Sequence, residues 1–541
     1  MIPPPNADAP SLGKRPAVES EHAGSLQDKA ALYLYLAALL TSLFVFANWI
    51  NIPITDQHAY RQTQTALSTF WLAQNGHWLT PQLYETPIVG FPWRNPLEFP
   101  VYQWLVAALK VTTGMPLEVA GRLVSITAFY GCLGGIHQLV KDGGGSRRLF
   151  HLIAATLLLS PEYLFWSRTF MIESTALFLT ISYLALLHRF LVRKTWGCLV
   201  VAILCGVLGV LTKVTTFPSF AVASLMLIAL HQLQSQNFPH QRHWLRVTLP
   251  ALLSLGICFV AIQWWVHYCD EVKSQTVFGK YLTSQAMSQW NYGEASLRFS
   301  SKLWVRTIWN RSVPEAVGGF LGVIVCLVGF WFANLRFRLL IGSLLGLFLL
   351  PFLLFTNLHV VHNYYQYSNA IFLVAALGVA LHVLSQRLGQ TLFIVVILTV
   401  ATNQILWFKD VDSVSFEHSW RDRDLLIARY IKTQTQPGQV LVMFGSDGSS
   451  VIPYYAERRA LTIPTQLTTG ELDSALANIP QNAGNLPIGA VILNGVGLDQ
   501  HAMEVNRLVK RIGAIRSFSR VERHGSYVVF FPRTDVAFPK L

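Results

Sequence analysis

The chain has 541 residues, of which 52% are hydrophobic and only 13% are charged, and its net charge is +13. Soluble domains carry about 25% charged residues, so this composition excludes an ordinary soluble protein. Apolar runs recur between Ala30 and Phe408, and at roughly 17–22 residues they match the length that an α-helix needs to cross a bilayer. Because Lys and Arg between membrane spans set orientation, the positive charge does not indicate nucleic-acid binding. We therefore predict a polytopic α-helical membrane protein.

Residues 1–28 are rich in Pro, Ala, Ser and charged residues, which is typical of a disordered tail. The region 29–408 contains eleven apolar segments that we interpret as transmembrane helices, at 30–50, 118–140, 149–166, 169–190, 197–212, 214–232, 247–268, 315–333, 338–356, 366–386 and 391–408. A further run, 99–113, is shorter and is entered through Pro96 and Pro100, which break helices. We interpret it as a re-entrant or interfacial helix within the first external loop, 51–117.

Basic residues between the predicted spans indicate the orientation. They form five clusters, which are Lys141 with Arg147 and Arg148, Arg189 with Arg193 and Lys194, Arg242 with Arg246, Arg336 with Arg338, and Arg387. These clusters fall at alternate connections only if 99–113 does not cross the membrane. Since Lys and Arg favour cytoplasmic loops, we predict a cytoplasmic N-terminus and an outward C-terminus. We expect the plasma membrane, as the inner membrane of a bacterium.

From Lys409 onward the hydrophobicity drops. Strands are predicted at Val440–Phe444, Ala490–Leu493 and Tyr527–Phe531, with helices between them at Arg423–Lys432 and Ala502–Ile512. The region 409–541 is therefore expected to be a small α/β domain on the extracytoplasmic side.

Two acids face the predicted outer side. Asp56 follows the first span directly, and Glu173 opens a later one. Charged groups at membrane depth are costly and are therefore functional candidates. A buried acid that stays ionised can take a proton from an acceptor as a general base. The alternatives are a turn or helix-capping role for Asp56 and a favourable charge at a helix N-terminus for Glu173.

Cations lie on the same side. Lys213 stands between two apolar runs, and Arg61, Arg94 and Arg168 lie in neighbouring outer segments. Such groups suit a phosphate-bearing substrate, because Arg offers bidentate contacts and Lys a point charge. The alternative for Lys213 is a lysine whose ammonium reaches the interface.

An outer turn at 359–367 carries two histidines and three tyrosines. It would cap a donor site or form part of an interfacial aromatic belt. His58 and His362, together with the acids, are candidate ligands for a divalent cation such as Mg²⁺ or Mn²⁺. The chain has no GxxxxGK[ST], GxGxxG, HExxH or GxSxG motif, which argues against ATP hydrolysis and serine-hydrolase chemistry.

Several of these segments, in this order, resemble the GT-C glycosyltransferases that use dolichyl- or polyprenyl-phosphate sugars. That group includes protein O-mannosyltransferases and the aminoarabinose transferase acting on lipid A. The matching segments are Asp56 in DQHAYRQTQTA, Asn95–Leu105, Ser160–Glu162 with Ser167-Arg168 and Ile172-Glu173, Gly209–Lys213, Tyr364-Tyr365, and more weakly Ile452–Arg459. The resemblance covers about residues 30–408.

The resemblance implies a polyprenyl-phosphate-linked sugar as donor, and a protein, lipid A or an envelope glycan as acceptor. It implies Asp56 as general base with Glu173 assisting. The lipid phosphate would be bound by a set of mostly basic residues, namely Arg61, Lys213, His362, Tyr364 and Arg168. The loop residues facing the acceptor would be His58, Arg94 and Glu98.

Three other classes are weighed against this one. A transporter or flippase of lipid-linked saccharides would more often show inverted repeats and Gly- or Pro-broken helices in matching halves, which the sequence lacks. An O-antigen ligase using a lipid diphosphate donor would favour a large external loop rich in Arg and His, for which 269–314 is the candidate. A non-catalytic scaffold would not need acids and cations gathered on one face.

Overall fold

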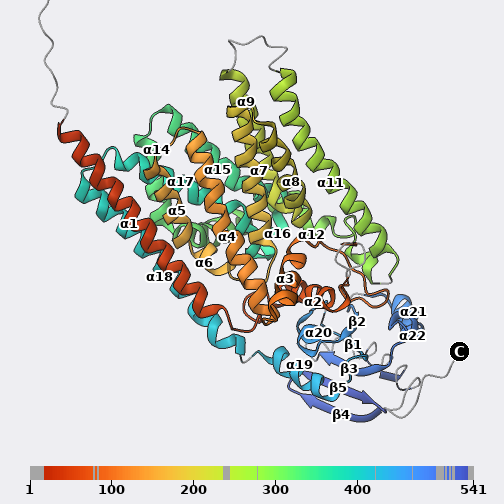
Figure 1. The fold of residues 1–541 in the computed structure, drawn as a ribbon. Coiled ribbons are helices and arrows are strands. Elements are labelled where there is room, and N and C mark those ends of the chain that lie inside the picture. Colours follow the sequence, from red (N-terminus) through yellow and green to blue (C-terminus); the bar gives the residue numbers. More distant parts are fainter. Residues whose placement is uncertain are drawn as a thin grey trace, which may run out of the picture.

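The computed structural model describes residues 18–76, 80–81, 85–234, 244–276, 278–420, 422–446, 448–465, 467–494, 505, 509–510, 513 and 518–533. Long helices form a bundle, and a five-stranded sheet lies at one end of it (Figure 1). The bundle helices are α1 (Val18–Trp49), α4 (Leu117–Asp142), α5 (Arg147–Leu159), α6 (Pro161–Trp166), α7 (Glu173–Arg193), α8 (Trp196–Thr212), α9 (Phe217–Gln234), α11 (Leu249–Ser274), α14 (Phe320–Phe332), α15 (Leu335–Leu354), α17 (Tyr367–Ser385) and α18 (Gln390–Trp420).

Helices cover most of each of the eleven predicted spans, although the span predicted to begin at residue 169 begins at Glu173. Among the described residues, eight helices are long and apolar enough to cross a membrane, or nine if a bent pair counts as one span. Two of the expected spans fall short of that criterion. The helix α8 is apolar but has 17 residues, and the segment 149–166 is divided at Pro161 into α5 and α6. Because α5 has 13 residues, it is only about 20 Å long.

The bent pair corresponds to the predicted span 315–333. It joins Lys302–Val317, which contains a π-helix, to α14 through an 82° bend. Gly318 and Gly319 form the bend with φ values of 74° and 86°, which favour glycine. A Cβ at Gly319 would meet the indole of Trp407 in α18, so the close packing of α18 also requires glycine there.

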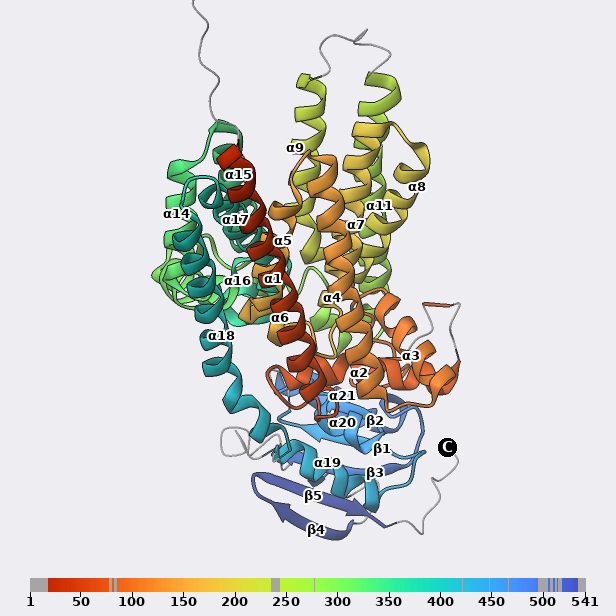
Figure 2. The same ribbon diagram turned by 60° about the vertical axis from the view of Figure 1, so that its left-hand side comes forward.

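The run predicted not to cross the membrane is helix α3 (Val101–Thr113), which starts after Pro100 and ends at Gly114. Together with α2 (Ala59–Asn75), it lies at the end of the bundle that faces the sheet (Figures 1 and 2). Its position at that end of the bundle agrees with an interfacial helix.

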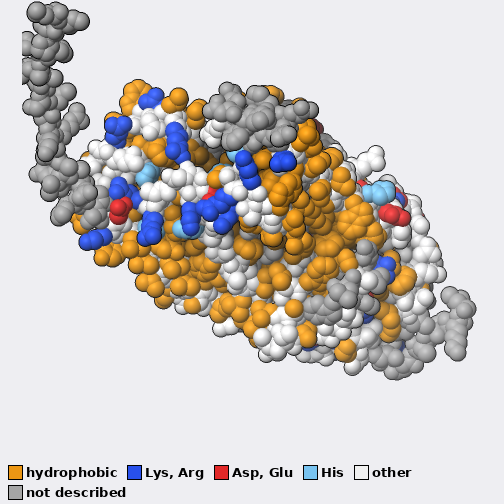
Figure 3. Space-filling model, turned by 45° about the horizontal axis from the view of Figure 1, so that its top comes forward, with side chains coloured by type: hydrophobic (Ala, Val, Ile, Leu, Met, Phe, Trp, Pro, Cys, Tyr) orange, Lys and Arg blue, Asp and Glu red, His pale blue; other side chains and the backbone are white. Residues whose placement is uncertain are grey.

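The opposite end of the bundle carries the basic clusters. Arg193 pairs with Asp142 at 3.4 Å, Arg336 donates to the Gly143 carbonyl at 2.6 Å, and Arg148 pairs with Asp28. Figure 3 shows Lys and Arg side chains gathered there above a broad hydrophobic flank. Members of three of the five predicted basic clusters therefore lie at this end, whereas Arg242 lies outside the described residues. The direction of the termini across the membrane stays a prediction.

Helix α1 begins at Val18, within the segment 1–28 that we expected to be an irregular tail. Residues 18–29 contain no proline and continue directly into the first apolar span, so the helix can extend into them. Residues 1–17 lie outside the described part of the chain.

The sheet domain begins with α19 (Arg423–Gln434), which confirms the predicted helix at Arg423–Lys432. The strands are β1 (Val440–Phe444), β2 (Arg459–Ile463), β3 (Ile488–Asn494), β4 (Phe518–His524) and β5 (Tyr527–Pro532), in the order β2-β1-β3-β5-β4. The strand β1 pairs in parallel with β2 and β3, and β5 pairs antiparallel with β3 and β4. Between the strands lie the helices α20 (Val451–Ala456), α21 (Thr469–Ala477) and α22 (Ile479–Asn482).

Three of these strands were predicted, and β2 and β4 were not. The outer strand β4 is mostly polar and carries exposed charged residues such as Arg520 and Arg523, so it lacks an apolar run. The strand β2 is short, and it begins at the second of two consecutive arginines, Arg458 and Arg459. The helix expected at Ala502–Ile512 falls largely outside the described residues.

Candidate active site

The polar segments predicted to lie on the outer side meet at the end of the bundle that adjoins the sheet domain. They are the loop after α1, the turn between α6 and α7, the corner after α8, and the segment α16 (Thr356–Val361) with η7 (Asn363–Gln366). Their charged side chains form three ion pairs, and their aromatic and imidazole rings lie together beside these pairs.

The first ion pair joins Asp56 to Arg168. The Arg168 Nη1 to Asp56 Oδ2 distance is 3.0 Å, and both side chains are fully buried. The Gln62 amide donates to the other Asp56 oxygen, Oδ1, and its own oxygen accepts from the Phe170 backbone N–H at 3.0 Å. Both carboxylate oxygens of Asp56 are therefore engaged, and Gln62 connects the loop to the turn after α6.

Two buried arginines hold the end of α1 in place. The Arg168 guanidinium lies 3.6 Å from the centroid of the Trp49 ring. Arg122 in α4 donates to the carbonyls of Trp49 and, at 3.3 Å, of Pro53. The backbone leading to Asp56 is thus held from within the bundle.

The second ion pair joins Lys213 to Glu173 at 2.6 Å. Glu173 begins α7, where a carboxylate interacts favourably with the positive end of the helix dipole. Lys213 ends α8 in an extended conformation, and its ammonium lies 4.4 Å from the centroid of the Tyr365 ring. Within the described residues, Glu173 Oε2 has no hydrogen-bond partner. Burial lowers the pKa of Lys213, and the Glu173 carboxylate opposes that shift.

The third ion pair joins Arg61 in α2 to Glu98 at 3.0 Å. Glu98 also accepts from the Gln103 amide at 3.1 Å. The charges of Arg61 and Glu98 both act on Lys213, and that of Glu173 acts on Arg61. The second and third pairs therefore form one coupled group of two cations and two carboxylates, which we call the Lys213–Arg61 group.

Aromatic and imidazole rings lie beside this group. His58 starts α2 in the left-handed region with φ 52°, and its Nε2 lies 2.8 Å from Asn363 Oδ1. The centroid of its ring lies 4.9 Å from that of Tyr364 and 5.2 Å from that of His362. The Tyr60 hydroxyl is 3.4 Å from the His362 ring nitrogens. Burial lowers the pKa of His58 and lowers that of His362 to about 4, so both rings are neutral at neutral pH.

Most of the predicted site residues are brought together in this region. Arg168, predicted to bind the lipid phosphate, pairs with Asp56. Arg94 is half-buried and lies within electrostatic range of Tyr268 in α11. The catalytic and phosphate-binding roles stay predictions.

The described residues do not fit a divalent cation. No group of three or more His, Cys, Asp or Glu side chains converges among them. His58 and His362 are in ring contact, but Asp56 faces Arg168 and Glu173 faces Lys213.

A buried acid pair was missed by the sequence analysis. The Gln366 amide donates to Glu162 at 2.7 Å and also to Glu315, and Ser312 donates to the Gln366 oxygen. Nearby, Arg311 donates to the His359 carbonyl and, at 3.3 Å, to the Val360 carbonyl. The available signal was an acid after proline within an apolar run, which both Glu162 and Glu315 show.

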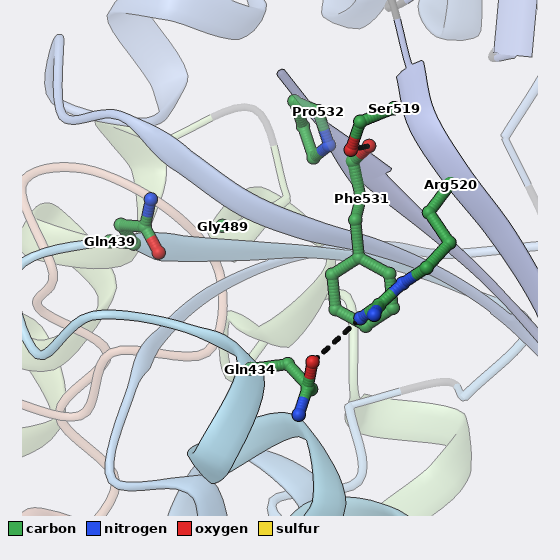
Figure 4. Close-up of a pocket in the computed structure, with 7 residues that line it drawn as sticks. All are labelled: Gln434, Gln439, Gly489, Ser519, Arg520, Phe531 and Pro532. Carbon is green, nitrogen blue, oxygen red and sulfur yellow. Dashed lines mark hydrogen bonds between the residues drawn. The ribbon is translucent and has the colours of Figure 1, made fainter. Parts of the chain in front are cut away.

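A separate pocket of about 300 Å³ opens on the sheet domain (Figure 4). It lies near β4, the edge strand opposite to β2. Arg520 donates to Gln434 at 2.7 Å, pairs with Glu522 at 2.8 Å, and lies over the Phe531 ring. Its guanidinium is thus already engaged by side chains of the domain itself.

Comparison with known proteins bears on the fold. No family model and no curated protein matches the sequence. The structure is similar to that of ArnT from Cupriavidus metallidurans bound to undecaprenyl phosphate, with a TM-score of 0.61 and 14% sequence identity. The apo state of the same protein gives a TM-score of 0.55, also at 14% identity. Each comparison covers 93% of this chain and 99% of the other. The chain therefore has the GT-C membrane fold that its motifs predicted, with a small sheet domain at one end.

Proposed function

We propose that the protein is an integral membrane glycosyltransferase that moves a sugar from a polyprenyl-phosphate donor to an extracytoplasmic acceptor. The observation that carries the proposal is the Lys213–Arg61 group, which lies at the sheet-domain end of a GT-C fold. The ArnT structure of this fold was obtained with undecaprenyl phosphate bound. Two coupled cations at the end of a bundle suit a phosphate whose lipid tail runs into the bilayer.

The chemistry follows from the charge that develops in the reaction. The bond between the sugar C1 and the phosphate oxygen breaks, and the lipid phosphate leaves with an additional negative charge. Lys213 and Arg61 would stabilise that charge more in the transition state than in the bound donor. The acceptor nucleophile attacks C1 from the opposite face, which predicts inversion, and its proton passes to a carboxylate.

Asp56 is the proposed acceptor of that proton, with Glu173 in a supporting role. In the structure, Arg168 and Gln62 engage both Asp56 oxygens, so donor or acceptor binding would have to release one of them. Glu173 has one oxygen without a hydrogen-bond partner among the described residues. A donor phosphate that pairs with Lys213 would release the other Glu173 oxygen, Oε1, from its ion pair. Glu173 is therefore the second candidate base.

Orientation follows from the basic end of the bundle. Because Lys and Arg favour the cytoplasmic side, that end would face the cytoplasm, and the site and sheet domain would face outward. In a bacterium this membrane would be the inner membrane. A protein, lipid A or an envelope glycan would then reach the site from the extracytoplasmic side.

The test is transfer of radiolabelled sugar from a panel of polyprenyl-phosphate sugars by purified protein. The variants are Asp56→Asn and Lys213→Met, and the matched control is Lys280→Ala, which removes an exposed lysine paired with Glu471. Removing one group that stabilises the developing charge is expected to reduce turnover by roughly 100-fold or more. The control should retain the wild-type rate.

Three outcomes would contradict the proposal. Turnover of diphosphate-linked donors only would indicate a ligase-type enzyme. Movement of lipid-linked saccharide across liposome membranes without sugar transfer would indicate a flippase. Equal activity in wild type, Asp56→Asn and Lys213→Met would remove this site from the reaction.

A further inference from the structure

The sheet domain is not an independent appendage of the membrane bundle. One face of its sheet shares an apolar core with the first external loop and α2. This core contains Ile54, Trp71 and Ile88 from the loop side, and Leu461 and Leu472 from the sheet domain. Every one of these side chains is buried, so the two parts of the chain exclude water from each other.

Backbone hydrogen bonds extend the sheet into the external loop. The Ala460 N–H donates to the Pro87 carbonyl at 2.9 Å, and the Thr462 N–H donates to the Ile88 carbonyl at 3.0 Å. Leu461 also forms an antiparallel bridge with Val89. The loop thus covers the free edge of β2, as an added strand does in β-augmentation.

Side chains reinforce the same contact. Arg459, the first residue of β2, pairs with Glu85 of the loop at 3.0 Å. Its guanidinium also lies 4.0 Å from the centroid of the Trp71 ring in α2. Both groups of the ion pair are largely buried, so the contact is part of the folded interface and more than a solvated surface pair.

Tyr455 carries the contact to the loop that holds Asp56. Its hydroxyl accepts from the Ile54 backbone N–H at 2.9 Å, two residues before Asp56. The Glu118 carboxylate, at the start of α4, acts electrostatically on the same hydroxyl. Burial raises the pKa of Tyr455, so the hydroxyl keeps its proton and can accept and donate at once. Ile54 itself is fully buried, and a buried N–H without a partner is costly.

The Asp56 loop is therefore held from two sides. From the bundle, Arg122 in α4 donates to the Trp49 and Pro53 carbonyls. From the sheet domain, Tyr455 binds the next backbone N–H, that of Ile54. Thr55 adds a third contact by donating to the Ser419 carbonyl at the end of α18.

We infer that Tyr455 is a positioning residue that holds the Asp56 loop, so the sheet domain completes the active site. The catalytic part of this inference rests on the proposed function, whereas the structural part does not. Tyr455 acts through the backbone of Ile54 and need not touch either substrate. A chain ending at Phe408 would accordingly lose donor turnover as well as sugar transfer.

The test compares Tyr455→Phe with Tyr454→Phe in the full-length protein. Tyr454 is the neighbouring aromatic residue, and its hydroxyl lies 3.5 Å from Glu118. Within the described part of the chain, it forms no hydrogen bond to the Asp56 loop. Two quantities are measured: amide hydrogen exchange of a peptide covering residues 50–58, and kcat and KM for sugar transfer. Loss of one hydrogen bond to a buried N–H predicts about five- to tenfold faster exchange and a similar fall in kcat for Tyr455→Phe, with KM little changed.

The exchange measurement decides the structural part even if no donor is turned over. Unchanged exchange in Tyr455→Phe would overturn the inference. Faster exchange with an unchanged kcat would overturn the positioning role while leaving the contact intact. Equal effects in Tyr454→Phe would show that the response belongs to α20 as a whole and would also overturn it.

Discussion

The ammonium of Lys213 and the carboxylate of Glu173 lie 2.6 Å apart in a buried ion pair. The cation best placed for a lipid phosphate therefore already has a counter-ion. Arg61 likewise has a counter-ion, the Glu98 carboxylate. Binding of an anionic headgroup must then be an exchange, in which phosphate replaces carboxylate at each cation.

This exchange predicts that Glu173→Gln binds undecaprenyl phosphate more tightly while transferring sugar more slowly. The variant lacks the carboxylate that competes with phosphate for Lys213. We expect affinity for undecaprenyl phosphate to rise about tenfold, which is a modest change for a partly screened electrostatic interaction. Binding would be measured by tryptophan fluorescence in detergent. Burial lowers the pKa of Lys213, and the Glu173 carboxylate opposes that shift. Without this carboxylate, Lys213 should lose its proton at a lower pH. As the pH rises, affinity for undecaprenyl phosphate should therefore weaken earlier in the variant than in wild type.

The matched control is Glu471→Gln, which removes an exposed carboxylate paired with Lys280. It should bind undecaprenyl phosphate as wild type does. Weaker binding by Glu173→Gln would show that the carboxylate supports phosphate binding and does not compete with it.

The fully buried pair of Asp56 and Arg168 predicts a strong asymmetry among stability variants. Arg168→Met leaves the Asp56 charge buried without its partner and should destabilise the protein by about 3–5 kcal/mol. The double variant Asp56→Asn with Arg168→Met should regain much of that loss. Thermal unfolding of the purified proteins in detergent checks both, and additive losses would contradict a direct pair.

Acid sensitivity should come partly from His362. Burial lowers its folded-state pKa from 6.5 to about 4, so the unfolded chain binds more protons between these values. The His362 contribution to the free energy of unfolding is therefore constant above about pH 6.5. Below that pH it lowers stability progressively as the pH drops from 6.5 toward 4. His58 is shifted in the same direction and contributes to the same slope.

His362→Asn should flatten the fall of the melting temperature over this interval. His267 lies on α11 with an exposed side chain, so His267→Asn serves as the control. An unchanged slope in His362→Asn would assign the acid sensitivity to other groups.

Local pattern was sufficient for most of the helices and for three of the strands. The strand β1 occupies the predicted residues Val440–Phe444, because a short apolar run bounded by polar residues is visible in any window. The division of 149–166 at Pro161 is equally a local effect, although we read that segment as one span. The strand β4 was missed because its exposed, charged residues leave no apolar pattern.

The site was predicted as a set of residues but not as a set of pairs. Asp56 and Arg168 are 112 residues apart in sequence, and Lys213 and Glu173 are 40 apart. Nothing local distinguishes an acid that serves as a base from one that neutralises an arginine. Tyr455 is a further example, because its contact with Ile54 joins residues 401 positions apart.

The sequence by itself determined the membrane class, the helical segments and the side on which the polar residues gather, because hydrophobicity and charge act over one span or loop. Only the tertiary structure decided which carboxylate meets which cation, and that the sheet domain binds the Asp56 loop. Those choices depend on how helices and strands pack against one another. In a buried site each charge must find a partner, and the fold alone brings that partner within reach.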